Sequence, residues 1–400
     1  MTFSFSFSGD DIEEDPQRAS PPSADPGVGN STPASSSTHF STTAGAFPVQ
    51  GKPLLPPLPH DLDQLLARLP SKIAFSLLNV DLEDGSNNSN NGQRQLALPR
   101  RELWDVRVQL MAEDDDPSTA VAGNESSDAS EARAGLGQHD VKTGIYEGGF
   151  KSWESSVDLV KVLAQENVAE GWLSRGPCVV VELGCGTALP SLALFTWALN
   201  RPVPAQPLTL VLADYNPSVL SLVTLPNLIL AWAHQQRPTN PLVAEAFTPD
   251  GEELELTPDL LAAFRASLAE RQITLSFLSG AWSPEFVDLL YATATTTTTS
   301  SSSHPSDPAT ATLILGSETI YSPFALSSFS ATLLAILQRE RRDRPGGQAR
   351  AVVAAKRLYF GVGGSLDDFV DAMRGMGVDV RMLREETQGV RRGVVECLLS

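Results

Sequence analysis

A short stretch at residues 178–192, Cys-Val-Val-Val-Glu-Leu-Gly-Cys-Gly-Thr-Ala-Leu-Pro-Ser-Leu, constrains the fold more than any other part of the chain. Its valine run at 179–181 lacks polar alternation, which is typical of a strand buried on both faces of a parallel sheet. Gly184 and Gly186 then allow a turn in which the backbone approaches a ligand closely. Apolar residues next recur at helical spacing. The stretch therefore predicts a strand, a glycine turn and a helix in direct succession, which is a ligand-binding corner of an α/β fold.

The spacing within this corner narrows the choice of ligand. Glu182 stands two residues before Gly184, and the third glycine of the dinucleotide fingerprint is missing because position 189 is leucine. The turn is instead similar to the first motif of methyltransferases that use S-adenosylmethionine (SAM), in which the turn backbone lies against the amino-acid part of SAM. A tight turn in another kind of α/β protein stays an alternative, because short motifs also arise by chance.

An acidic residue ends the next predicted strand. Residues 208–214 are apolar or small until Asp214. A carboxylate at the carboxyl end of the second strand can accept hydrogen bonds from both ribose hydroxyls of a nucleoside. Asp214 is therefore a second, independent indication of a nucleoside cofactor. Pro217 suits the first turn of the helix that follows.

Further patterns complete a sheet. We predict strands at 273–278 and 351–360, a strand with its terminal loop at 312–323, helices at 258–268, 324–339 and 366–374, and a closing hairpin of strands at 378–383 and 393–399. Five parallel βα units closed by an antiparallel pair give an α/β, Rossmann-like seven-strand sheet. Its ligand would lie in the crevice at the carboxyl ends of the strands.

A loop and helix precede the first core strand. Residues 140–163 join a glycine-containing loop to an amphipathic helix, with Ser152 or Ser155 available to cap it. Trp153 and Glu154 lie where a loop could close over a cofactor. Alternatively, the tryptophan is anchored in the core beneath an ordinary helix start, which is the commoner fate of this residue type.

Composition divides the chain into segments. Residues 1–52 are rich in Ser, Pro, Thr and Gly, cannot bury enough apolar surface to offset chain entropy, and are predicted to be disordered. Residues 53–112 form a small N-terminal element with a helix from Asp61, a strand at 73–80 and a second strand-like piece at 100–110. Residues 113–138 are an acidic low-complexity insertion, and 139–400 form the main domain, which carries a second low-complexity insertion at 291–311.

Charge and cysteine content exclude several classes of function. The net charge of −19 argues against a protein that binds nucleic acid through phosphate contacts. An acidic balance suits a basic protein as substrate, but acidic disordered segments explain it equally well. The three cysteines include no CxxC pair and no neighbouring histidine at metal-ligand spacing, so neither a metal site nor a disulfide framework is indicated.

Localisation follows from what the sequence lacks. No uncharged apolar run reaches the length of a membrane span, and the first residues have neither the basic region nor the apolar core of a signal peptide. We expect a protein of the cytoplasm and nucleus without membrane attachment, acting as a monomer.

Six blocks of sequence, taken together, resemble the protein-histidine N-methyltransferase family of the seven-β-strand class, in the fungal type that acts on a ribosomal protein. The blocks lie at 146–154, 182–186, 214–216 with 223–227, 279–283, 317–321 and 359–364. The resemblance covers residues 140–400. It implies SAM as cofactor and methylation of a ring nitrogen of a histidine in a large-subunit ribosomal protein, with effects on ribosome biogenesis and translation.

The resemblance also implies roles for individual residues. The residues that would line SAM are Lys151, Ser152, Trp153, Glu154, Ser155, Glu182, Gly184 and Gly186. Those that would hold its ribose side are Asp214, Tyr215 and Asn216, those at its adenine are Gly280, Ala281 and Trp282, and the far wall is Ser317. Ala281 stands where the family more often has an acidic residue, so backbone contacts to the adenine are expected there.

The implied reaction needs positioning more than a base. A neutral imidazole nitrogen is already a competent nucleophile near neutral pH, so the enzyme must align the reacting atoms, select the ring tautomer and exclude water. Glu318 and Tyr321 are the candidates for orienting the imidazole, and Asn216 is a further one. Alternatively, Glu318 is a loop carboxylate that caps the next helix.

The sequence leaves other functions open as alternatives. A methyltransferase acting on lysine shares the Trp-Glu loop and the architecture of the fourth strand, and a SAM-binding scaffold without catalysis shares the whole cofactor site. A nicotinamide dehydrogenase is disfavoured by the missing third glycine and by the lack of a His or Tyr/Lys pair for hydride chemistry.

Overall fold

The structure is a computed structural model of the chain. It describes residues 54–82, 94–114, 148–166, 171–174, 176–296, 310–359 and 363–399. The predicted disordered segment at 1–52 lies outside the described residues, as do most of the predicted insertion at 113–138 and residues 297–309 of the one at 291–311.

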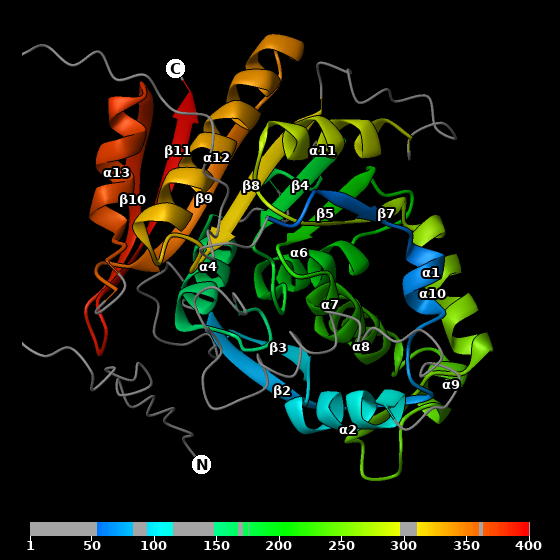
Figure 1. The fold of residues 1–400 in the computed structure, drawn as a ribbon. Coiled ribbons are helices and arrows are strands. Elements are labelled where there is room, and N and C mark those ends of the chain that lie inside the picture. Colours follow the sequence, from blue (N-terminus) through cyan, green and yellow to red (C-terminus); the bar gives the residue numbers. More distant parts are fainter. Residues whose placement is uncertain are drawn as a thin grey trace, which may run out of the picture.

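A large mixed sheet forms the centre of the molecule (Figure 1). Its strand order is β1-β7-β5-β4-β8-β9-β11-β10. The parallel strands are β4 (Cys178–Leu183), β5 (Leu208–Asp214), β7 (Ile273–Ser279), β8 (Ala311–Ser317) and β9 (Ala349–Lys356). The antiparallel strands are β1 (Leu58–His60), β10 (Val378–Glu386) and β11 (Arg392–Leu399).

The predicted α/β, Rossmann-like class is confirmed, with the glycine corner on the central strand β4. The predicted number of strands is not, because β1 adds an eighth strand at the edge of β7. Nothing in the proline-rich sequence around Leu58–His60 has a strand pattern. Its extended conformation follows from pairing with a strand far along the chain.

Alternate residues of the central strands face two separate hydrophobic cores. Val180 and Leu210 pack into one core, and Val181, Val211 and Ile314 into the other. This is the packing expected where helices cover both faces of a parallel sheet. The chain therefore has three layers, helix, sheet and helix, as Figure 1 shows.

The helices of the first face are α4 (Glu154–Gln165), α6 (Leu189–Leu199), α8 (Leu225–Gln236) and α10 (Pro258–Glu270). Those of the second face are α11 (Pro284–Thr296), α12 (Pro323–Asp343) and α13 (Leu366–Gly375). Shorter helices are α1 (Leu62–Leu66), α7 (Pro217–Val219), the π-helix η1 (Leu220–Thr224) and α9 (Pro241–Glu245).

One helical run is long and apolar enough to cross a membrane by length and composition alone. It extends from Pro217 to Gln236 through α7, η1 and α8, and 78% of its most apolar window is buried inside the molecule. Its Trp232 packs edge-on against Phe264 of α10, with ring centroids 5.4 Å apart. The run is therefore a core helix of the first face.

A second, three-stranded sheet packs outside the first face. Its order is β3-β2-β6, with β2 (Lys72–Leu82) between β3 (Arg94–Arg101) and β6 (Glu253–Glu255). The predicted strand at 73–80 is confirmed, but the strand-like piece at 100–110 is wrong because α2 occupies Leu103–Asp114. Val106 is fully buried, whereas Trp104 and Val108 are 52% and 55% exposed. The alternation that suggested a strand comes from two opposite faces of a helix.

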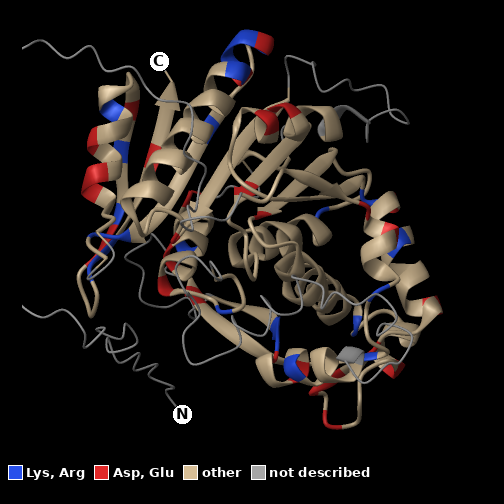
Figure 2. Ribbon diagram, in the orientation of Figure 1, with Lys and Arg blue, Asp and Glu red and all other residues tan. Residues whose placement is uncertain are grey.

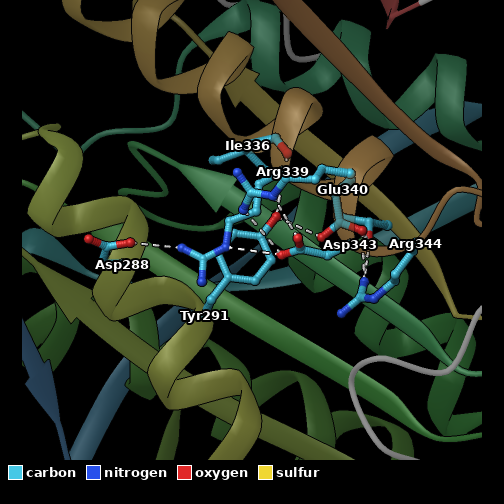
Figure 3. A network of polar contacts seen from close by, with 9 residues as sticks. Asp288, Tyr291, Ile336, Arg339, Glu340, Asp343 and Arg344 are labelled. Atoms are coloured by element: carbon cyan, nitrogen blue, oxygen red, sulfur yellow. Dashed lines mark hydrogen bonds and ion pairs between the residues drawn. The ribbon is translucent and has the colours of Figure 1, made fainter.

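Charged residues lie mainly at the periphery, and α6, α8 and the central strands carry almost none (Figure 2). An exception is a polar network between α11 and α12 (Figure 3). There the Tyr291 hydroxyl donates to Glu340 Oε1 at 2.7 Å, and Arg344 and Thr312 both bind Glu340 Oε2. Because Thr312 is the second residue of β8, this network lies near the amino end of the strands, away from the glycine turn.

Candidate active site

The glycine turn after β4 is held tightly from both sides. Gly184 and Gly186 have φ of 68° and 51°, a left-handed conformation that favours glycine. A side-chain carbon at Gly184 would lie 2.6 Å from Thr319 Cγ2, and one at Gly186 would lie 3.1 Å from the carbonyl oxygen of Gly149. The Gly-Gly loop before α4 and the loop after β8 thus meet at this turn.

Two residues of η1 and α8 fix the carbonyl groups of the turn. The Thr224 hydroxyl donates to the Gly186 carbonyl at 2.7 Å, and the Asn227 amide donates to the Thr187 carbonyl at 3.0 Å. Both lie in the 223–227 block, which was noted for its resemblance without a stated role. Their contacts show why this block accompanies the glycine turn: it sets the shape of the turn.

Asp214 links the first two strand ends. Its Oδ2 accepts the N–H of Gly186 at 2.9 Å and its Oδ1 accepts the N–H of Asn216 at 3.0 Å. Contact of this carboxylate with ribose hydroxyls stays a prediction. Asn216 itself is buried and donates to the Gly148 carbonyl at 3.3 Å, so its amide faces the loop.

Glu182 is buried at the end of β4, with 1% of its surface exposed. Its Oε2 accepts the N–H of Ser191 at 3.0 Å and also the Ser191 hydroxyl, which ties the strand to the first turn of α6. Its Oε1 is buried and has no hydrogen-bond partner among the described residues. Burial raises the pKa of Glu182 to about 8, partly offset by the Ser191 bonds.

The loop before α4 reaches three different strand ends. The hydroxyls of Ser152 and Thr187 are 2.8 Å apart, and the Lys356 ammonium lies 4.8 Å from the centre of the Trp153 ring. Glu154 Oε2 accepts from Arg392 Nη1 at 3.0 Å. Trp153 is neither fully buried nor in either core. The interpretation of Trp153 as a core residue is therefore wrong, and closure of its loop over a cofactor stays a prediction.

The prediction that Ser152 or Ser155 caps α4 is wrong. Trp153 itself occupies the N-cap position of α4, and no side chain caps the helix there. Ser152 binds Thr187, and the Ser155 hydroxyl donates to Oε1 of Glu318. Both serines that were expected to cap α4 are therefore used at the site.

Glu318 lies at the carboxyl end of β8 in a strained conformation. Its φ is 57°, which is unusual for a residue with a side chain. Its Oε1 accepts from Ser155 and its Oε2 accepts from the Tyr359 hydroxyl at 2.5 Å. Glu318 does not cap the next helix, since the Ser322 hydroxyl accepts the N–H of Ala325 and is the cap of α12.

Tyr359 was expected inside the fifth strand, at 351–360, and this is wrong. β9 ends at Lys356, so Tyr359 lies in the loop beyond it. Its phenol is buried, and burial together with the nearby Glu318 carboxylate raises its pKa well above the ordinary value. It therefore remains a hydrogen-bond donor near neutral pH. Tyr359 begins the 359–364 block of the resemblance, but the sequence indicated no role for it at the site.

Ser317 and Tyr321 flank Glu318 less directly. Ser317 is the last residue of β8 and is half-buried. Tyr321 is half-buried against the second core, and its carbonyl accepts the N–H of Gly364 at 3.1 Å. The structure therefore brings Tyr321 close to the loop after β9.

The loop after β7, expected at the adenine, is covered by the N-terminal segment at residues 54–60. Ala281 N–H donates to the Leu55 carbonyl at 3.0 Å, and Leu55 N–H donates to the Tyr215 hydroxyl at 3.2 Å. A side-chain carbon at Gly280 would lie 2.4 Å from the Pro56 carbonyl oxygen. We call residues 54–60 the N-terminal strap. It was not expected from the sequence.

Trp282 turns away from the strap. It is buried in the second core against Phe329, with ring centroids 5.5 Å apart, and its ring edge lies against Gly184. Its side chain thus supports the glycine turn from beneath. A role of Gly280, Ala281 and Trp282 at the adenine stays a prediction.

The contacts form one continuous series around the carboxyl ends of the parallel strands. This is the edge at which open α/β sheets bind their ligands. No family model matches the chain. It is similar to Histidine protein methyltransferase 1 of Saccharomyces cerevisiae, with 36% identity over 92% of this chain and 89% of that protein. The chain belongs to the histidine protein methyltransferase family.

Further relatives carry the same name. Histidine protein methyltransferase 1 of Schizosaccharomyces pombe is 34% identical over 74% of this chain and 75% of that protein. The homolog of Bos taurus is 28% identical over 64% of this chain and 57% of that protein. Among solved structures, a human methyltransferase 10 domain containing protein is 8% identical, with a TM-score of 0.32 over 62% of this chain and 82% of that one, which is too distant to argue from.

As a member of this family, the chain is an enzyme that methylates histidine in proteins, and the family implies SAM as the methyl donor. The site residues fit SAM. The glycine turn permits close approach of the backbone, the Asp214 carboxylate lies beside this turn at the carboxyl end of β5, and the buried Glu182 Oε1 has no hydrogen-bond partner among the described residues. Among the described residues, no group of three or more His, Cys, Asp or Glu side chains is placed to hold a metal ion.

Proposed function

We propose that this enzyme transfers a methyl group from SAM to a ring nitrogen of a histidine in a large-subunit ribosomal protein, and that the modification affects ribosome biogenesis and translation. Family membership supports histidine as the target. The observation that carries the chemistry is Glu318, a strained carboxylate at the end of β8 that is anchored beside the expected cofactor loop.

The residues that would hold SAM form two groups. Asp214 and the glycine turn lie at the ends of β4 and β5, and the loop at 151–155 faces them through Ser152 and Thr187. When bound, SAM supplies a methyl group on a positively charged sulfur, and the bonding electrons stay on sulfur when the methyl leaves. The enzyme then needs only to align a nitrogen with that methyl group and keep water out.

Glu318 is the candidate for orienting the target ring. A carboxylate that accepts the N–H of one ring nitrogen fixes the tautomer and leaves the lone pair on the other nitrogen free to react. Methylation makes the ring cationic, and its N–H proton can pass to Glu318 and then to solvent. Tyr321 and Asn216 are weaker candidates, since the Asn216 amide already binds the Gly148 carbonyl.

The site also favours a neutral acceptor over a lysine. A lysine must lose a proton before it can accept a methyl group. The Glu318 carboxylate accepts from two hydroxyls, those of Ser155 and Tyr359, and the Lys356 cation lies 5.7 Å from the Tyr359 ring centre. A single anchored carboxylate suits an imidazole N–H.

We propose further that the enzyme acts as a monomer in the cytoplasm and nucleus, without direct contact to nucleic acid or attachment to membranes. The net charge of −19 supports recognition of a basic protein and opposes phosphate binding. Cell fractionation and sedimentation of the purified chain test these points. A salt-sensitive complex with free ribosomal RNA would contradict the exclusion of nucleic acid.

The deciding experiment is incubation with labelled SAM and isolated large-subunit ribosomal proteins, followed by mass spectrometric location of the methyl group. We expect label on histidine of one protein. Label on lysine would favour a lysine methyltransferase, and SAM binding without any label would favour a scaffold.

Asp214 provides a separate test of the cofactor site. We expect Asp214→Ala to lower SAM affinity at least about a hundredfold, because two hydroxyl bonds to a charged group are lost. Calorimetry measures the affinity, and the melting temperature shows whether the turn has survived. Asp214→Asn is the matched control, since it keeps an acceptor for one backbone N–H. Wild-type affinity in a folded Asp214→Ala protein would contradict the ribose assignment.

A further inference from the structure

We propose that Tyr359 and Ser155 are positioning residues for Glu318, which they hold so that its open acceptor positions receive the ring N–H of the target histidine. The inference rests on the proposed function. It assigns a role to the loop after β9, and it makes the choice of ring nitrogen depend on two hydroxyl groups that do not touch the substrate.

Three anchors hold Glu318 in place. Its backbone N–H donates to the Ala354 carbonyl at 3.0 Å, and its two carboxylate oxygens accept from Ser155 and Tyr359. The anchors come from β9, α4 and the loop beyond β9. A non-glycine residue at φ 57° persists only where its surroundings enforce it. Such enforcement is typical of functional positions.

The geometry leaves the carboxylate available to a ligand. Ser155 is fully buried and Tyr359 is nearly so, whereas Glu318 is half-buried. The hydroxyls therefore bind Glu318 from the protein side. A carboxylate offers about four acceptor positions, and these two bonds use two of them. Two positions therefore remain for a ligand.

The tyrosine is held as firmly as the glutamate. The Lys356 N–H donates to the Tyr359 hydroxyl at 3.3 Å, so the hydroxyl is fixed between a donor and the carboxylate. The Tyr359 N–H donates to the Gly364 carbonyl at 3.0 Å. Because its pKa is raised, the phenol keeps its proton and donates throughout the neutral range.

Ser155 connects this carboxylate to the expected cofactor loop. It lies in the first turn of α4, two residues after Trp153. α4 is itself fixed to β11, because Arg392 binds Glu154 at 3.0 Å and Asp158 at 2.7 Å. The loop that would line SAM and the group that would orient the acceptor are thus parts of one rigid set of contacts.

Fixing the carboxylate has a direct chemical consequence. Only the ring nitrogen opposite the held N–H can face the methyl group, so one methylhistidine isomer forms. If Glu318 turns, either nitrogen can be presented, and fewer encounters are aligned for reaction. Loss of a positioning hydroxyl should therefore lower kcat and mix the two isomers, and for Tyr359, which lies outside the expected cofactor loop, SAM affinity should change little.

Tyr359→Phe is the variant to test, with Tyr291→Phe as its matched control. Each tyrosine donates to a glutamate, the buried Tyr359 to Glu318 at 2.5 Å and the half-buried Tyr291 to Glu340 at 2.7 Å. The Tyr291 network lies at the other end of β8 (Figure 3), about 16 Å away at the usual rise per strand residue. Each change removes one oxygen.

The assay uses the full chain, labelled SAM and isolated large-subunit ribosomal proteins. We expect Tyr359→Phe to lower kcat between about tenfold and a hundredfold and to yield both methylhistidine isomers. SAM affinity by calorimetry should stay within about twofold. Tyr291→Phe should leave kcat and the isomer ratio within about twofold of the wild type, because distant sites act independently.

A second variant covers the case in which Tyr359→Phe fails to fold. Ser155→Ala removes the other hydroxyl from Glu318 and should change kcat and the isomer ratio in the same way. In a Glu318→Gln background, both changes should have little further effect, since they act through the same carboxylate.

The outcomes separate this inference from the proposed function. Wild-type protein that labels no histidine would overturn the proposed function itself. Wild-type protein that labels histidine, together with folded Tyr359→Phe and Ser155→Ala variants of unchanged kcat and a single isomer, would overturn the positioning role alone. Equal loss of activity in Tyr291→Phe would point to general destabilisation and would also overturn it.

Discussion

At the scale of single residues, Glu182 is a buried acid whose ionisation is coupled to folding. Burial raises its pKa from an ordinary 4.5 to about 8 in the folded chain. Between these values the folded state binds more protons than the unfolded state. Its contribution to stability is therefore complete below pH 4.5 and is lost as the pH rises through 8.

Glu182→Gln tests this linkage. Glutamine is neutral and has the same shape, and it can accept the Ser191 bonds with its oxygen. Between pH 5 and 8, we expect the free energy of unfolding of the wild type to fall relative to the variant by up to about 1.4 kcal/mol per pH unit. Denaturant titrations at several pH values measure it, and parallel curves for the two proteins would contradict the raised pKa.

The sequence was informative about some residues and silent about others for physical reasons. Gly184 and Glu318 stand directly after strands that a local apolar pattern predicts, so their place at the sheet edge could be inferred. Tyr359 could not be placed, because apolar residues resume after Lys356 and Arg357 and extend the apparent strand past the end of β9. Its bond to Glu318 joins residues 41 positions apart, which no local pattern encodes.

At the scale of elements, the N-terminal strap packs on the loop after β7 with no room to spare. Gly280 has φ of 105°, and a side-chain carbon there would lie 2.4 Å from the Pro56 oxygen. We expect Gly280→Ala to lower the free energy of unfolding by about 2–6 kcal/mol, from backbone strain and overpacking together. Thermal or denaturant unfolding measures the loss.

Gly389 is the matched control for this change. It has φ of 70°, but a side-chain carbon there would meet nothing within 4 Å. Gly389→Ala should therefore lower the free energy of unfolding only by the backbone strain, about 1–3 kcal/mol. Equal losses at both positions would mean that the strap yields easily and does not fit tightly against the loop.

Helix α2 shows where local patterns mislead. Its Trp104, Val106, Val108 and Leu110 alternate with polar residues, as in a strand. Only Val106 and Leu110, one helical turn apart, pack into the small core with Phe150. The alternation could not be resolved without knowing which residues tertiary packing would bury, since strand and helix both place Val106 and Leu110, four positions apart, on the same face.

At the scale of the whole molecule, local stability should follow position in the large sheet. β4 is paired on both sides, to β5 and β8, and lies between the two cores, whereas β1 is three residues long and paired only to β7. We expect the amides of β4 to exchange with solvent slowest and those of β1 among the fastest of the sheet. Mass spectrometry of hydrogen exchange measures this, and protection of β1 equal to that of β4 would contradict it.

The order of the main elements could be predicted because each strand and helix has its own local pattern. The eighth strand, β1 at the edge of the sheet, could not be predicted, since it depends on a partner far along the chain. The same holds for β6, a three-residue strand within a polar connection that joins the second sheet by pairing with β2. Short strands of this kind are specified by their neighbours.

The pairing of β1 with β7 also has a consequence for the order in which the molecule is completed. His60 and Ser279, whose side chains bond at 2.7 Å, are 219 residues apart in the chain. At a synthesis rate of about 5–20 residues per second, the later partner leaves the ribosome some 10–40 seconds after the earlier one. The N-terminal strap therefore leaves the ribosome well before the strand that pairs with it, and the nascent chain passes through a period in which β1 has no partner strand.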